Sequence, residues 1–285
     1  MEAKFHDTIE SGALTLQRFW IWSIVLNYFL GGSASTLYLH LFWSNIVLKY
    51  PSVGREDTLI KLIPAILATL GLLGPIFTIG KPSAKVNFTN PIINSNFTKE
   101  TFFALLFIAL SIGNSIKGGV ILAYSAFGAA ILFMCCRGVI FSRFQNESLW
   151  NSIIVLIIFL TSAGLTGYGL WIILRVRFLN TTGGLWITWG VILISLNLLV
   201  LGYYLWIKDY RISSRILKPL WAKATLLITL DGCIPLLTLL GIYFSGLAVE
   251  MSKTWVTRLG TCCGISLCLG GWIKFYLFLK NDIDI

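Results

Sequence analysis

The side chains with the greatest chemical potential in this sequence are polar groups inside long apolar segments. Asp231 lies in one such segment, shortly before Pro235, and Lys223 lies two helical turns upstream. Asn27 lies in the first apolar segment and is followed by Tyr28. A charged residue at the centre of a bilayer costs ~2.5–3.5 kcal/mol on insertion scales, so such residues are functional hypotheses by default. The alternatives are an ion pair between Asp231 and a neighbouring helix, and a packing hydrogen bond for Asn27.

The histidines and cysteines do not form the pattern of a redox centre. A membrane haem is commonly held by axial histidines, but His6 precedes the first apolar segment and His40 lies near its far end. The six cysteines lie in apolar stretches, and none forms a C-x-x-C pair. The sequence therefore indicates neither a zinc site nor an iron–sulfur cluster. We expect no haem and no metal in this chain.

The composition is that of an integral membrane protein. Hydrophobic residues make up 56% of the 285 residues and charged residues only 12%, whereas soluble domains carry about 25% charged residues. The formal net charge of +10 would suggest nucleic acid in a soluble protein. Here the basic residues lie mostly in loops and at segment ends, which fits the surface of a lipid bilayer. We therefore expect no nucleic-acid partner.

Eight segments are long enough to cross a bilayer, which needs about 20 helical residues. Because every backbone amide must be paired within lipid, each segment is predicted to be a helix. The fold class that we predict is an all-α integral membrane protein with eight transmembrane helices. The segments are Phe19–Leu48, Leu62–Gly80, Thr101–Ile116, Gly118–Cys136, Ser148–Leu174, Phe178–Ile207, Ala224–Val249 and Leu259–Leu279.

The first and fifth segments resemble each other at an offset of 130 positions. This register matches Trp20 to Trp150, Thr36 to Thr166 and the following tyrosines to each other. Apolar segments also match by chance, which is the alternative. A true repeat would comprise four helices, so both halves would run in the same direction across the membrane. We therefore predict two four-helix bundles in tandem, over residues 1–147 and 148–285.

The polar groups gather toward one face if the helices alternate in direction. That face holds the beginning of the first, third and seventh helices and the end of the second and fourth, below a connection over residues 80–99. Polar groups converging below a loop predict a pocket for an amphiphilic small molecule. The residues expected there are Asn27, Tyr28, Thr78, Gly80, Lys81, Pro82, Glu100, Arg137, Lys223 and Asp231.

Three stretches resemble the eight-helix membrane anchors of molybdopterin oxidoreductases, the NrfD-like family of polysulfide-reductase and dimethyl-sulfoxide-reductase anchors. "NYFLGGSASTLYL" is similar to the first helix of the family, which is rich in small residues. "TIGKP" followed by "NSNFTKE" resembles its Gly-Lys/Arg-Pro loop and the start of its third helix. "RFQNESLWNSIIVLIIFLTSAGLTG" resembles its Trp-Asn-Ser stretch and fifth helix. These stretches are residues 27–39, 78–82 with 94–100, and 143–167.

The resemblance implies a division of labour between subunits. A molybdopterin catalytic subunit and a ferredoxin-like iron–sulfur subunit would lie outside the bilayer, in a prokaryotic inner or plasma membrane. The anchor would carry no redox metal, bind quinone or menaquinone, and exchange electrons with the iron–sulfur subunit. It would be a quinone-site or non-catalytic subunit of a respiratory oxidoreductase complex.

The resemblance also implies roles for the polar residues. Quinol oxidation releases protons, and a carboxylate in a pocket of low dielectric constant suits their uptake. Asp231 and Glu100 are the catalytic candidates for this role. The quinone-binding candidates are Asn27, Tyr28 and Thr78 for the quinone oxygens, Lys81 or Arg137 for anionic intermediates, and Gly80, Pro82 and Lys223 in the surrounding site.

One position departs from the family pattern and leaves two alternatives open. The family loop commonly begins with Asp or His, whereas this chain has Thr78, which does not take up a proton at working pH. Either a carboxylate elsewhere does that work, or the anchor is purely structural and does not turn quinone over. The other alternative is a secondary transporter, although the repeat is parallel and inverted repeats are common in that class.

Overall fold

The computed structural model describes residues 24–45, 54–79, 91–144, 149–175, 184–211, 225–247 and 253–281 of the chain. All of them are helical except a two-residue turn over 118–119. The first helix covers residues 24–45. It is followed by α2 (Gly54–Ile79), α3 (Pro91–Lys117), α4 (Val120–Phe144), α5 (Leu149–Arg175) and α6 (Gly184–Arg211). The seventh helix, residues 225–247, contains η1 (Thr229–Cys233) and α8 (Ile234–Leu247), and α9 (Lys253–Asn281) is the last.

Six of these helices are long and apolar enough to cross a membrane, which makes the chain a multi-pass helical membrane protein. The spans are Thr98–Lys117, Val120–Ser142, Ile153–Leu174, Leu185–Trp206, Thr225–Phe244 and Thr254–Leu277. Large apolar side chains cover their outer surfaces, as in Ile121 of α4 and Leu199 of α6, which are 83% and 72% exposed. In a bilayer these side chains contact lipid, so their exposure costs nothing.

The two remaining helices differ from these six for a physical reason. In α2 the apolar part is short, Thr58–Leu73. The first helix is rich in small and hydroxyl residues, and all of its residues from 31 to 38 are buried. A helix that is enclosed by other helices does not need the apolar surface that lipid demands. The predicted membrane character is confirmed, while the count of eight spans stays a prediction.

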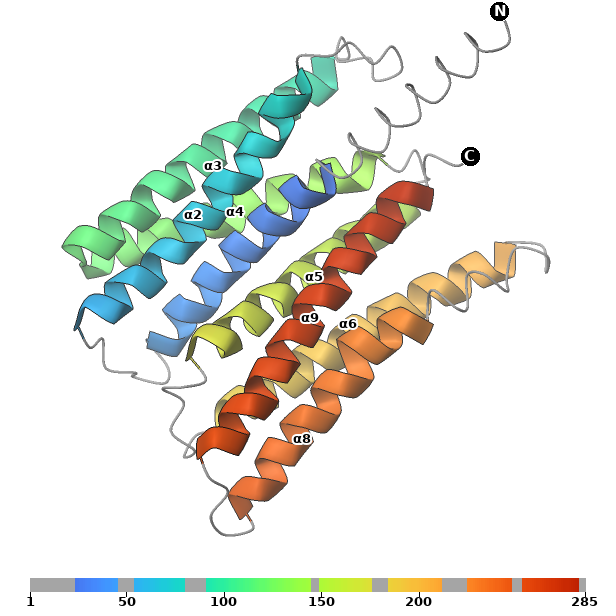
Figure 1. Ribbon diagram of the computed structural model, residues 1–285. Coiled ribbons are helices and arrows are strands. Elements are labelled where there is room, and N and C mark those ends of the chain that lie inside the picture. The colour runs from blue at the N-terminus through green and yellow to red at the C-terminus, as the bar shows by residue number, and fades with distance from the viewer. Residues whose placement is uncertain are drawn as a thin grey trace, which may run out of the picture.

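The helices lie side by side as long rods (Figure 1). α2, α3 and α4 pack together on one side, and α6 and α8 lie on the other. The first helix, α5 and α9 lie between these groups, and α4 and α9 both contact α5. The start of the first helix and the end of α9 lie at the same end of the bundle, which we call the terminal end. A chain that crosses a membrane an even number of times has both of its ends on the same side, and this arrangement agrees with that.

Two glycines make the turn between α3 and α4, at the end of the bundle opposite the terminal end. Gly118 and Gly119 have φ angles of 68° and 112°, a backbone region that glycine adopts without steric cost. The amide of Gly118 donates to the carbonyl of Asn114 at 3.0 Å, which closes the last turn of α3. The turn therefore aligns α3 and α4 as antiparallel neighbours, and this alignment brings Glu100 level with Arg137.

Candidate functional site

A buried ion pair between α3 and α4 forms the core of the candidate site. The guanidinium Nε of Arg137 lies 2.8 Å from Oε1 of Glu100, and both side chains are almost completely buried. The third helix begins earlier than the apolar pattern predicts, at Pro91, so Glu100 lies inside the helix rather than at its start. A paired carboxylate costs less to bury than an isolated one, because the opposite charge offsets part of the desolvation penalty.

The first helix completes the coordination of Arg137. Nη2 donates to the side-chain oxygen of Asn27 at 2.5 Å, and Nη1 donates to the main-chain carbonyl of the same residue. Gly31 lies one turn further along, where a Cβ atom would overlap the guanidinium group. The lack of a side chain at this position is therefore what allows Arg137 to reach Asn27. We call Glu100, Arg137 and Asn27 the first polar cluster.

Aromatic rings surround the first polar cluster. The guanidinium carbon of Arg137 lies 4.6 Å from the ring centre of Phe133 and 5.8 Å from that of Tyr28. Tyr28 in turn packs edge-on against Phe141 and Phe159, at 5.2 and 6.1 Å between ring centres. The rings exclude water, and electrostatic interactions are stronger in such a medium. The cluster therefore combines a carboxylate, fixed hydrogen-bond donors and an apolar surround.

Asp231 belongs to a different cluster, between the seventh helix, α6 and α9. Its carboxylate forms a buried ion pair with Nζ of Lys274, which also donates to Oδ1 of Asn197 at 3.0 Å. The seventh helix forms a π-helical turn here, over Thr229–Cys233. Gly232 lies within this turn, and Pro235 follows its end by two residues. We call Asp231, Lys274 and Asn197 the second polar cluster.

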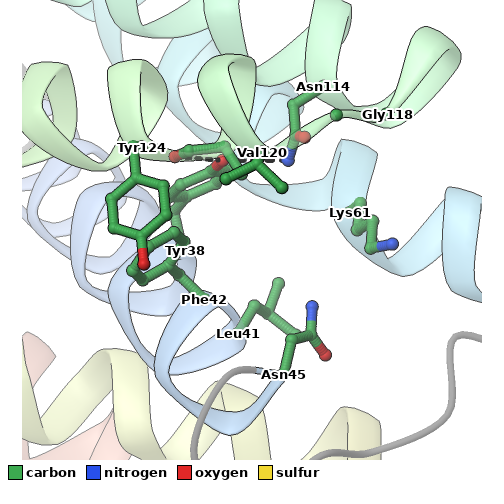
Figure 2. Close-up of a pocket in the computed structure, with 11 residues that line it drawn as sticks. Tyr38, Leu41, Phe42, Asn45, Lys61, Asn114, Gly118, Val120 and Tyr124 are labelled. Atoms are coloured by element: carbon green, nitrogen blue, oxygen red, sulfur yellow. Dashed lines mark hydrogen bonds between the residues drawn. The ribbon is translucent and has the colours of Figure 1, made fainter.

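A cavity of about 470 Å³ opens at the end of the bundle opposite the terminal end (Figure 2). The amide of Asn114 donates to the hydroxyl of Tyr38 at 3.0 Å, and this hydroxyl donates to the carbonyl of Ala123. The cavity is lined by Tyr38, Leu41, Phe42, Asn45, Lys61, Asn114, Gly118, Gly119, Val120, Ala123 and Tyr124. The predicted site residues whose side chains are described, Asn27, Tyr28, Glu100, Arg137 and Asp231, do not line this cavity.

The predicted site residues thus fall into three groups. Asn27, Tyr28, Glu100 and Arg137 come together, as expected for one site. Asp231 is paired with Lys274, which corresponds to the alternative of an ion pair with a neighbouring helix. Thr78 lies in α2, and its side chain is outside the described part of the chain. Gly80, Lys81, Pro82 and Lys223 lie outside the described residues.

Sequence reasoning missed three residues that the structure places in the clusters. Lys274 lies near the end of the predicted segment Leu259–Leu279, and only the structure shows that it is buried opposite Asp231. Asn197 stands in the middle of an apolar run, where an amide is a signal for a buried hydrogen bond. Gly31 lies in a stretch rich in small residues, and the sequence alone does not connect it with Arg137. Within the described residues, no three His, Cys, Asp or Glu side chains are grouped closely enough to hold a metal ion.

The fold and the clusters define a multi-pass helical membrane protein with two buried acid–base pairs. Comparison with known proteins found no matching family model, no matching curated protein and no matching solved structure. The chemistry of the clusters is therefore the basis for a functional proposal.

Proposed function

We propose that this chain is the membrane anchor subunit of a molybdopterin and iron–sulfur oxidoreductase, and that it binds quinone at the first polar cluster. The proposed chain has eight transmembrane helices in two tandem four-helix bundles, residues 1–147 and 148–285. An iron–sulfur subunit would dock at the terminal end and exchange electrons with the bound quinone. A prokaryotic inner or plasma membrane would hold the complex.

The observation that supports this proposal most is the convergence of three helices on Arg137. A carboxylate of α3, with an amide and a tyrosine ring of the first helix, meets one buried guanidinium of α4. Quinone chemistry requires hydrogen-bond partners for the two ring oxygens and an acceptor for the protons that quinol releases. Asn27 and Arg137 would bind a quinone oxygen, and Glu100 would accept a proton. The aromatic rings would contact the quinone ring.

Substitution of Glu100 by glutamine tests the proposal in the intact complex. We expect the rate of menaquinol oxidation to fall by about 100-fold or more, because general acid–base catalysis contributes about 10²–10⁴-fold. Binding of menaquinone-4 to the purified chain, measured by equilibrium dialysis, should persist, because glutamine keeps the shape of the side chain. Activity of the complex with a soluble electron donor in place of menaquinol should be unchanged.

The cavity at the opposite end supplies the control. Asn114→Leu alters the cavity lining and leaves the first polar cluster intact, so it should not change menaquinol oxidation. A loss with Asn114→Leu and none with Glu100→Gln would place the quinone in that cavity and overturn the assignment. If menaquinone-4 does not bind to the purified wild-type chain, the quinone-binding function itself is wrong.

A further inference from the structure

Two pairs of helix boundaries repeat along the chain at the offset that the sequence suggested. α2 begins at Gly54 and α6 at Gly184, and α3 ends at Lys117 whereas α8 ends at Leu247. Both pairs are separated by 130 positions. Agreement at two boundaries that the sequence alignment did not use supports an internal duplication of four helices.

Contacts between the first helix and α5 show how the two halves are related. Ser33 donates to the hydroxyl of Thr166 at 3.1 Å, and Thr36 donates to the carbonyl of Ala163 at 2.6 Å. At an offset of 130, Ser33 corresponds to Ala163 and Thr36 to Thr166. Both contacts therefore join position 33 or its equivalent 163 in one half to position 36 or its equivalent 166 in the other half. Such reciprocity is the mark of a two-fold axis between the halves.

A second reciprocal contact involves α4 and α9. A Cβ atom on Gly138 of α4 would lie 3.2 Å from the ring of Phe159, and one on Gly271 of α9 would lie 3.9 Å from the ring of Phe29. Phe29 and Phe159 correspond at the same offset of 130. Gly138 and Gly271, which are 133 positions apart, thus face corresponding phenylalanines, as expected if α9 in the second half corresponds to α4 in the first.

The two ion pairs lie on corresponding helices of the two halves. In the first half, Glu100 of the third helix pairs with Arg137 of the fourth. In the second half, Asp231 of the seventh helix pairs with Lys274 of the eighth. The position equivalent to Arg137 is Gly270, and a Cβ atom there would overlap the Asp231 carboxylate. At the offset of 130 Glu100 corresponds to Leu230, so the acid of the second half is displaced by one residue and the base by one helical turn. Each half nevertheless has one buried acid–base pair between its third and fourth helices.

Stability alone does not explain why each half of the chain has a buried ion pair. Apolar side chains of similar volume commonly stabilise a protein as well as or better than a buried ion pair does. Ionisable residues inside a membrane are costly and mark proton or ion pathways. The π-helical turn at Asp231 is a second sign, because such turns are frequent at functional sites. The carbonyl of Leu230 in this turn accepts a hydrogen bond from Ser266 at 2.6 Å.

We propose that the second polar cluster is a proton-exchange site, the counterpart in the second half of the chain of the first polar cluster. A proton from water joins the Asp231 carboxylate, and the net charge of the ion pair rises from zero to +1. Lys274 keeps its own proton and its hydrogen bond to Oδ1 of Asn197. Loss of the proton from Asp231 to water restores the ion pair. The site needs no quinone, so it does not rest on the proposed function.

The surroundings of Asp231 supply one counter-charge. Among the described residues of α5, α6 and α9, Lys274 is the charged group that faces the carboxylate. The other titratable side chains buried or half-buried on these three helices are Tyr168, Tyr204, Cys263, Cys268 and Tyr276.

Infrared difference spectroscopy of the purified full chain, between alkaline and acidic buffer, tests this inference. We expect the wild-type chain to gain a carbonyl band of a buried protonated carboxyl group. This band should be absent in Asp231→Asn and unchanged in Thr238→Ala. Thr238 lies on the same helix and donates to carbonyls of that helix, so it is the matched control. Identical spectra of the wild-type chain and Asp231→Asn would overturn the inference.

A second variant guards against misfolding of Asp231→Asn. The double variant Asp231→Asn with Lys274→Gln leaves no buried charge without a partner, so we expect it to fold like the wild-type chain. It should lack the same band. Retention of the band in the folded double variant would assign it to another carboxyl group and refute the proposal. No quinone is present in these samples, so failure of either proposal can be recognised separately.

Discussion

Substitution of Arg137 by methionine should lower the free energy of unfolding by about 3–5 kcal/mol, the range for breaking a buried ion pair by removing one partner. The expected cause is the carboxylate of Glu100, which would remain buried without its counter-charge. The guanidinium hydrogen bonds to Asn27 would be lost at the same time. Unfolding by sodium dodecyl sulfate, followed by circular dichroism in mixed micelles, measures this change.

A double variant separates the ion pair from general packing. Arg137→Met combined with Glu100→Leu removes both charges, so we expect it to be markedly more stable than Arg137→Met alone. Arg258→Met is the control, because Arg258 is exposed and contacts the Trp255 ring. Its effect should stay within about 0.5 kcal/mol, as for most surface substitutions. Equal stability of Arg137→Met and the double variant would show that the buried charge of Glu100 is not the cause.

Substitution of Gly167 by alanine should cost about 1–3 kcal/mol, the range for an overpacked interior. A Cβ atom at Gly167 would lie 2.6 Å from both the Leu37 amide nitrogen and the Thr36 Cβ atom. Because the Leu37 nitrogen belongs to the backbone, the first helix and α5 would have to move apart. The reciprocal hydrogen bonds at this crossing would lengthen, and the same unfolding measurement reports the loss.

Gly164 gives a matched comparison one turn earlier on α5. A Cβ atom at Gly164 has no heavy atom within 4 Å. Gly164→Ala should therefore be neutral, or stabilising by up to ~1 kcal/mol because alanine is the better helix former. If both variants lose stability equally, glycine flexibility rather than close packing of the two helices explains the effect.

Much of the fold can be predicted from the sequence because lipid imposes a simple rule on it. Long runs without charge must be helices, and the structure places helices at all the predicted segments. The limits of these runs are less predictable, because a charged residue that finds a partner does not end a helix. Glu100 ends an uncharged run in the sequence, yet α3 continues through it to Pro91. Lys274 lies well inside α9 for the same reason.

The candidate site was predictable only in part. Polarity and helix direction bring Asn27, Tyr28, Glu100 and Arg137 to the same end of the bundle. The direction of a helix does not determine its rotation about its own axis. It therefore could not show that Asp231 faces α6 and α9 rather than the first polar cluster. That rotation depends on the π-helical turn and on where the glycines of neighbouring helices allow close approach. Three further predicted residues belong to the 80–99 connection and lie outside the described part of the chain, namely Gly80, Lys81 and Pro82.

The enclosed first helix has a consequence for the order in which the chain enters the membrane. It is made before α5, whose backbone supplies partners for its polar groups. Before α5 has been synthesised, Ser35 and Thr36 can donate to carbonyls of their own helix, as hydroxyl side chains commonly do. His40 differs, because its Nε2 atom lies 3.0 Å from the Gly164 carbonyl of α5. This imidazole gains that neighbour only after the fifth helix has been synthesised, so stable integration of the first helix is a late event.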